Sequence, residues 1–148
     1  MRKFLRMISV LMALVIMLTV PVYAQENNTR SNAYISAYDS ALFRGIGGEF
    51  HIWFRVVGTE IMDEIGALEI KVQQSPTGTG DWTTVKIFRK ADYPQMICEN
   101  TAGHTSHLTY YGISGNYYRA IVTVYAAKGN GTGCMIDYAE VLYLSPQY

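Results

Sequence analysis

The residues with the most reactive side chains gather in one short stretch, where Cys98 is followed by His104 and His107 and has Glu99 beside it. A cysteine nucleophile needs a histidine within reach as its base, and cysteine and histidine together also bind zinc. The spacing Cys-x5-His-x2-His matches no zinc signature, and a polar loop accounts for the same residues. We therefore expect no catalytic or metal site here. A small secreted hydrolase that uses Cys98 with His104, or a pair of carboxylates, stays as an alternative.

Paired carboxylates offer a second kind of hydrolytic chemistry. Glycoside hydrolysis needs two carboxyl groups that face each other about 5–10 Å apart. Asp63 and Glu64 are adjacent and are expected to diverge in a loop, and nothing in the pattern brings Glu49 or Glu60 to Asp137 across the fold. Solvated acids are the default. The glycine-rich runs lack the lysine and helix of a phosphate loop, and no acidic calcium loop occurs, so no cofactor is expected.

Aromatic side chains with polar neighbours are the remaining chemistry. In the segment "EFHIWFRVVG" His51, Trp53 and Arg55 alternate with apolar residues, and Tyr125 lies in the outward phase of a later segment. A flat aromatic ring next to such groups can stack on the C–H face of a sugar, and the same residue types are enriched in protein–protein hot spots. A Trp53 that merely covers a sheet face is the alternative. We take these four residues as candidate contacts for an extracellular glycan or protein.

The two cysteines, Cys98 and Cys134, are 36 residues apart and lack the Cys-x-x-Cys spacing of redox enzymes. In an exported protein they are consistent either with one disulfide or with two separate thiols. A bridge closing that loop would stabilise the fold by about 4 kcal/mol.

The beginning of the chain indicates export. Three cations within the first six residues precede the apolar run Met7 to Val20, and Pro21 and the small residues of "VYA" follow. This order is typical of a signal peptide, and the run is shorter than the roughly 20 residues of a membrane span. The protein is therefore predicted to be secreted, without stable membrane insertion after cleavage; retention as an uncleaved anchor is the alternative. The predicted parts are a signal peptide at 1–24, a polar disordered leader at 25–32 and one domain at 33–148.

The charge of the exported part excludes two classes of partner. Without the three cations of the leader, nine of the 12 Lys and Arg remain against 12 Asp and Glu, a formal net charge of −3. Nucleic acids and anionic lipids are bound by clustered Lys and Arg, and no such cluster occurs. We expect neither as a partner.

Short alternating segments separated by turn residues predict an all-β domain. The turn cluster "SPTGTGD" predicts a hairpin between its flanking strands, and residues 59–67 and 91–106 read as loops, the first with at most a brief helical turn. No amphipathic helix is indicated, and the fold class is a single antiparallel β-sandwich. The seven candidate strands are 33–43, 49–58, 68–74, 82–90, 107–113, 117–126 and 136–144.

The segment "GNYYRAIVTV" resembles the tyrosine corner of immunoglobulin-like sandwiches, with Tyr118 after a turn and Ala120, Val122 and Val124 inward. Ala120 stands where immunoglobulin domains have cysteine, which is closer to the fibronectin type III variant, and "DWTTVKIF" and "KGNGTG" resemble later strands of that fold. The resemblance spans about Glu49 to Leu144 and implies a structural role for Tyr118. It says little about a ligand.

The fragments "GTEIMDEIGALEI", "WTTVKIF" and "YYRAIVTVYAAKG" are also similar to small exported proteins of Gram-positive gut bacteria. That resemblance implies one secreted β-sandwich per chain. Together these features predict a non-catalytic secreted binding module. The alternatives are the small hydrolase and a structural protein whose exposed strand edges pair with further copies.

Overall fold

The computed structural model describes residues 32–146, so the predicted signal peptide and nearly all of the polar leader lie outside the described residues. The described part contains seven strands, one short 3₁₀ helix and no α-helix, and none of its helices is long and apolar enough to cross a membrane. The elements are β1 (Ile35–Arg44), β2 (Glu49–Ser75), β3 (Thr83–Arg89), η1 (Pro94–Met96), β4 (Ile97–Tyr111), β5 (Tyr117–Lys128), β6 (Gly131–Tyr138) and β7 (Leu142–Tyr143).

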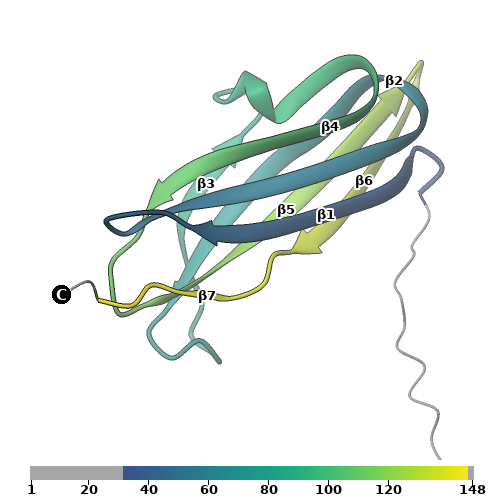
Figure 1. Ribbon diagram of the computed structural model, residues 1–148. Helices are drawn as coiled ribbons and strands as arrows, with labels where there is room; N and C mark the ends of the chain where they lie inside the picture. Colours follow the sequence, from purple (N-terminus) through teal and green to yellow (C-terminus); the bar gives the residue numbers. More distant parts are fainter. Residues whose placement is uncertain (1–31, 147–148) are drawn as a thin grey trace, which may run out of the picture. The chain divides into compact units, whose positions relative to one another are not determined.

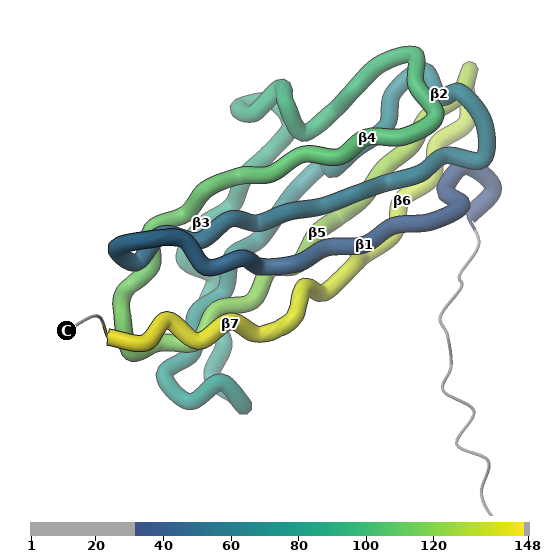
Figure 2. The backbone as a smooth tube through the Cα atoms, viewed as in Figure 1, coloured from purple at the N-terminus to yellow at the C-terminus, as the bar shows by residue number. Residues whose placement is uncertain are grey.

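All seven strands join one antiparallel sheet, and β2 is the strand that holds it together (Figure 1). The first half of β2 pairs with β1 and β4. The second half pairs with β5 along one edge, and along its other edge it pairs first with the beginning of β4 and then with β3. Figure 2 shows β2 curving over at its middle and running back behind its own first half. The sheet therefore curls, and its concave side encloses the core.

Period-two alternation decides which side chains enter the core. In β5, Tyr118, Ala120 and Val122 are fully buried, whereas Tyr117 and Arg119 between them are half-buried, which is the phase that the sequence indicates. The remaining large core side chains come from both halves of β2 and from the segments that close the curl: Phe50, Ile52, Phe54, Val56, Met62, Ile65, Ile70, Val72, Phe88, Met96, Leu108, Val124 and Leu144.

The predicted all-β class and antiparallel pairing are confirmed, as is the hairpin of β2 with β3. The immunoglobulin-like sandwich stays a prediction, because the strands form one curled sheet. Two loop predictions are wrong: residues 59–67 continue β2, and most of 91–106 belongs to β4. The last predicted strand, 136–144, is divided between β6 and β7.

The wrong loop prediction for residues 59–67 has a physical cause in the pairing of β2. The register between β2 and β4 shifts between Val57 and Met62, and the register between β2 and β5 shifts between Ala67 and Glu69. Each extra residue breaks the simple alternation of buried and exposed positions. Between these two shifts Met62, Ile65 and Ala67 are all buried, so the buried positions of this segment do not follow a simple period of two.

Candidate functional site

The outer face of the first half of β2 carries three of the four predicted contact residues. His51, Trp53 and Arg55 alternate with Phe50, Ile52 and Phe54, which have no exposed surface. Burial of one set forces the other set outward, because successive strand residues point to opposite faces.

Neighbouring strands complete this surface. Phe43 of β1 lies opposite His51, and His107 of β4 lies opposite Trp53. The rings of Phe43 and Trp53 meet edge to face with their centroids 6.5 Å apart, and those of His51 and His107 do so at 5.7 Å. These four side chains line a shallow open hollow of about 250 Å³. We call it the aromatic hollow.

Hydrogen bonds hold the His51 ring in place. Its Nε2 lies 3.1 Å from Glu49 Oε1, and its Nδ1 lies 3.0 Å from Thr109 Oγ1. The Glu49 carboxylate also accepts a hydrogen bond from the Tyr111 hydroxyl, which raises the pKa of that tyrosine. The histidine therefore forms a fixed wall of the hollow, since ring rotation would break two contacts.

Arg55 supplies a cation beside the hollow. It is exposed and lies opposite Asp39 on β1 and Thr105 on β4. The ion pairs found within residues 32–146 do not include it. Its guanidinium is therefore available to hydroxyl or carboxylate groups of a ligand on this face.

Tyr125, the fourth predicted contact, lies elsewhere. It sits on β5 opposite Gly66 and Cys134, and the Lys90 ammonium lies 5.0 Å from the centre of its ring. Burial raises the pKa of Tyr125, and the nearby Glu64 carboxylate adds to this effect. The structure thus brings together His51, Trp53 and Arg55 and leaves Tyr125 out.

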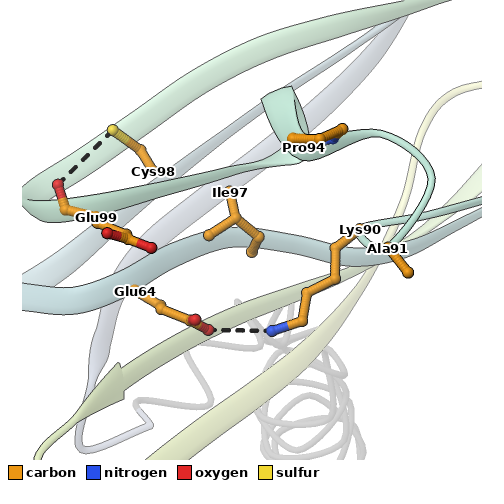
Figure 3. Close-up of a pocket in the computed structure, with 7 residues that line it drawn as sticks. All are labelled: Glu64, Lys90, Ala91, Pro94, Ile97, Cys98 and Glu99. Atoms are coloured by element: carbon orange, nitrogen blue, oxygen red, sulfur yellow. Dashed lines mark hydrogen bonds and ion pairs between the residues drawn. The ribbon is translucent and has the colours of Figure 1, made fainter.

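The cysteine and histidine residues considered for catalysis have different surroundings. Cys98 lines a second hollow, of about 520 Å³, and its Sγ makes only a weak 3.9 Å contact with the Glu99 carbonyl oxygen (Figure 3). His104 Nε2 lies 2.8 Å from the Gln95 carbonyl oxygen, and His107 belongs to the aromatic hollow. Within residues 32–146, no three His, Cys, Asp or Glu side chains are arranged to hold a metal ion.

The second hollow contains a charge pair instead. Glu64 and Lys90 are 3.0 Å apart and partly exposed, and Glu99 lines the same hollow (Figure 3). A lysine held between a carboxylate and the Tyr125 ring stabilises the contact between β2 and the end of β3.

The carboxylates considered as pairs are engaged separately. Glu49 contacts His51, and Asp137 accepts a 2.6 Å hydrogen bond from the Ser40 hydroxyl. Asp63 accepts a 2.7 Å hydrogen bond from the Gly129 amide, which lowers the pKa of Asp63, with a further contribution from Lys128.

A disulfide within the chain is excluded by the sheet order. Cys98 is half-buried on β4 and Cys134 is exposed on β6, and both are free thiols. In the part of the sheet that contains both cysteines, the strand order is β4, β2, β5, β6. Three strand spacings of about 4.8 Å therefore separate the two cysteines. A bridge needs Cα atoms within about 7 Å of each other.

Tyr118 lies in the core, as its resemblance to a tyrosine corner implies. Its side chain is fully buried, and its hydroxyl accepts a 2.7 Å hydrogen bond from the Ile113 amide and donates to Gln74 Oε1 at 3.0 Å. Its ring packs 5.1 Å from Phe50 and 6.2 Å from Tyr110. Burial raises the pKa of this hydroxyl.

The sequence reasoning missed two walls of the aromatic hollow, Phe43 and His107. The sequence does contain a signal for Phe43. If the glycine-rich "GIGG" segment is the turn of a hairpin, the residues before and after it pair in order, and Phe43 falls close to His51. No such signal existed for His107, because β4 reaches β2 through a long connection.

Comparison with known proteins gives little further information. No family model matches the chain, and no curated protein matches it. One solved structure, Spo0M, a sporulation control protein from Bacillus subtilis, has 11% sequence identity and a TM-score of 0.48 over 78% of this chain. The chain matches about half of that protein's length, 51%.

Proposed function

We propose that the protein is a non-catalytic secreted module that binds carbohydrate on the outer face of β1, β2 and β4. The observation that carries this proposal is the aromatic hollow, where Trp53 and Phe43 are presented beside the fixed His51 ring. A buried aromatic would pack into the core; here Phe43 keeps 54% of its surface exposed. Trp53 beside it is half-buried. Large aromatics that remain at least partly exposed on one surface are typical of binding sites.

The size and borders of the hollow favour a sugar over a protein. About 250 Å³ accommodates one ring, and the polar groups of Thr109, Arg55 and Asp39 lie along its borders. Sugar rings present apolar C–H faces for stacking and hydroxyls for such polar groups. A protein hot spot lies at the centre of a larger contact area whose outer contacts exclude water from it.

We further propose an immunoglobulin-like or fibronectin type III-like fold and secretion for this protein. The division of the curled sheet into β1–β2–β4 and β3–β2–β5–β6, with Tyr118 between them, supports an immunoglobulin-like or fibronectin type III-like module. The signal peptide pattern at residues 1–24 supports secretion, and the resemblance of three sequence fragments to exported proteins of Gram-positive gut bacteria agrees with it.

Trp53→Ala is expected to reduce glycan binding at least about tenfold, which corresponds to about 1.4 kcal/mol, because it removes the stacking surface. Binding is measured by pull-down of the purified protein on insoluble polysaccharides, mucin and peptidoglycan. Circular dichroism checks that the variant is folded.

Trp82→Ala is the matched control. Trp82 precedes β3 and stacks on Arg119 with 4.4 Å between the ring centre and the guanidinium carbon, away from the aromatic hollow. It should bind like the unaltered protein, as should Tyr125→Ala. Equal losses in both tryptophan variants would contradict the proposal, and no binding to any matrix would leave a protein partner as the better explanation.

A further inference from the structure

Strand β6 presents an unpaired backbone edge. Among residues 32–146, β6 pairs only with β5. Just beyond β6, the Ala139 amide donates to the Ala120 carbonyl at 3.0 Å, so odd-numbered residues here direct their N–H groups toward β5. Because hydrogen-bonding directions alternate along an antiparallel strand, Thr132, Cys134 and Ile136 direct their N–H and C=O groups outward.

This edge has few of the features that usually prevent strand pairing: its one charged residue, Asp137, is half-buried and accepts a hydrogen bond from Ser40 of β1. Edge strands are commonly protected by lysine, proline or a bulge. The residues of β6 include no lysine or proline, and its register with β5 is regular throughout. Ile136 and Tyr138 are 55% and 63% exposed. Cys134, which lies closer to the turn between β5 and β6, is exposed as well. By contrast β3, another edge strand, carries Lys86 and a register shift.

We propose that two copies of the chain pair β6 to β6, antiparallel about a two-fold axis at Cys134, and that the two Cys134 thiols form an intermolecular disulfide. This inference is independent of the proposed carbohydrate binding. The occupant is a second copy because the edge is complementary to itself. With Cys134 on the axis, Ile136 faces Thr132 of the second copy and Asp137 faces Gly131, so no charge meets a like charge.

The Cα separation of such a pair lies within the disulfide range, and the Cβ atoms, about 5.5 Å apart in a hydrogen-bonded pair, must approach to about 4.5 Å as the bond forms. Residues that exchange both backbone hydrogen bonds across an antiparallel ladder have Cα atoms about 5.5 Å apart. Disulfides span Cα separations of about 4.4–6.8 Å. Cys134 is the only residue that meets its own copy in this register, and it stands in the middle of Gly131–Tyr138.

The small contact area makes the covalent bond necessary. Stable interfaces bury upwards of about 1,000 Å² in total, which pairing along one eight-residue strand does not reach. The dimer is therefore expected only under oxidising conditions. Two Cys134 thiols and one molecule of a disulfide oxidant such as oxidised glutathione give one protein–protein disulfide and two reduced thiols of the oxidant, so atoms and electrons balance.

The test is incubation of the purified protein with oxidised glutathione, followed by non-reducing electrophoresis and light scattering. The expected product is a dimer that dithiothreitol returns to monomer, with a Cys134–Cys134 peptide seen by mass spectrometry. Cys98→Ser, the matched control, should dimerise fully, and Cys134→Ser should stay monomeric. A dimer joined through Cys98, or only glutathione-capped monomer, would overturn the proposal.

A second variant separates strand pairing from random thiol collisions. Ile136→Pro removes an outward N–H without touching the ladder to β5, and proline is tolerated at such edge positions. We expect dimer formation to slow at least tenfold. Ile136→Lys, which retains the N–H and adds a charge, should act in the same direction if the proline variant is unfolded. An unchanged rate in a folded variant would show that β6 pairing does not direct the disulfide.

Discussion

Replacing Gly66 with alanine is expected to lower the free energy of unfolding by about 3 kcal/mol or more. Gly66 lies in the second half of β2 with a φ of 152°, a conformation that side chains rarely adopt. A Cβ atom there would overlap the Met96 carbonyl oxygen where η1 meets β4. The obstacle is backbone, so the overlap is relieved only by shifting β4 away from β2. Guanidinium titration followed by fluorescence measures the loss.

Gly80→Ala provides the control for this prediction. A Cβ at Gly80 would meet nothing within 4 Å, so the change should stay within about 0.5 kcal/mol. If the two variants unfold at the same denaturant concentration, the close approach of Gly66 to Met96 does not constrain the fold.

Tyr118→Phe is the second large expected effect, with a loss of about 1–3 kcal/mol. The missing hydroxyl leaves the partly buried Ile113 amide and Gln74 side chain without their hydrogen-bond partner. Tyr118→Ala should cost about 3–5 kcal/mol, because it also removes the ring against Phe50. Denaturant titration of both variants checks the order.

Tyr117→Phe is the matched change on the neighbouring residue. The Tyr117 ring stacks 4.7 Å from Tyr143 at the partly exposed face, so loss of its hydroxyl should be nearly neutral. A neutral Tyr118→Phe, or an equally damaging Tyr117→Phe, would show that the Tyr118 hydroxyl bonds do not stabilise the fold.

The raised pKa of Tyr118 gives the same residue a pH signature. Burial keeps the folded hydroxyl neutral, whereas the unfolded chain ionises near pH 10, so stability is complete below about pH 10 and falls as the pH rises through the raised pKa. Tyr125 and Tyr111 act in the same direction. Urea titrations between pH 8 and 11 should show a smaller pH dependence for Tyr118→Phe than for the unaltered protein.

Regular alternation made part of this fold predictable. Phe50 to Val56 and Tyr118 to Val124 each keep a strict period of two, and both were placed in strands with the correct face inward. The residues around Met62 offered no such pattern, because register shifts interrupt it. The first part of β4 was missed for another reason: its exposed Glu99, Asn100 and Ala102 give it a polar, loop-like composition.

Only the residues of the candidate site that lie on one strand could be predicted from the sequence. Alternation within β2 places His51, Trp53 and Arg55 on one face. The pairing of β2 with β1 and β4 decides that Phe43 and His107 join them, and that information lies in long-range register. For the same reason the sequence alone could not show that Tyr125 lies apart, or that three strand spacings separate Cys98 from Cys134.

The 27 residues of β2 are hydrogen-bonded to four other strands, and this determines how the domain unfolds. If β2 unfolds, both halves of the sheet lose the strand to which their other strands are bonded. Neither half is therefore expected to be stable without the other. Amide protons in both halves of β2 should therefore exchange with deuterium only when the entire domain opens. A cut in β2 beyond Gly58, where its pairing with β1 ends, should therefore destabilise the whole domain and should not leave one half folded.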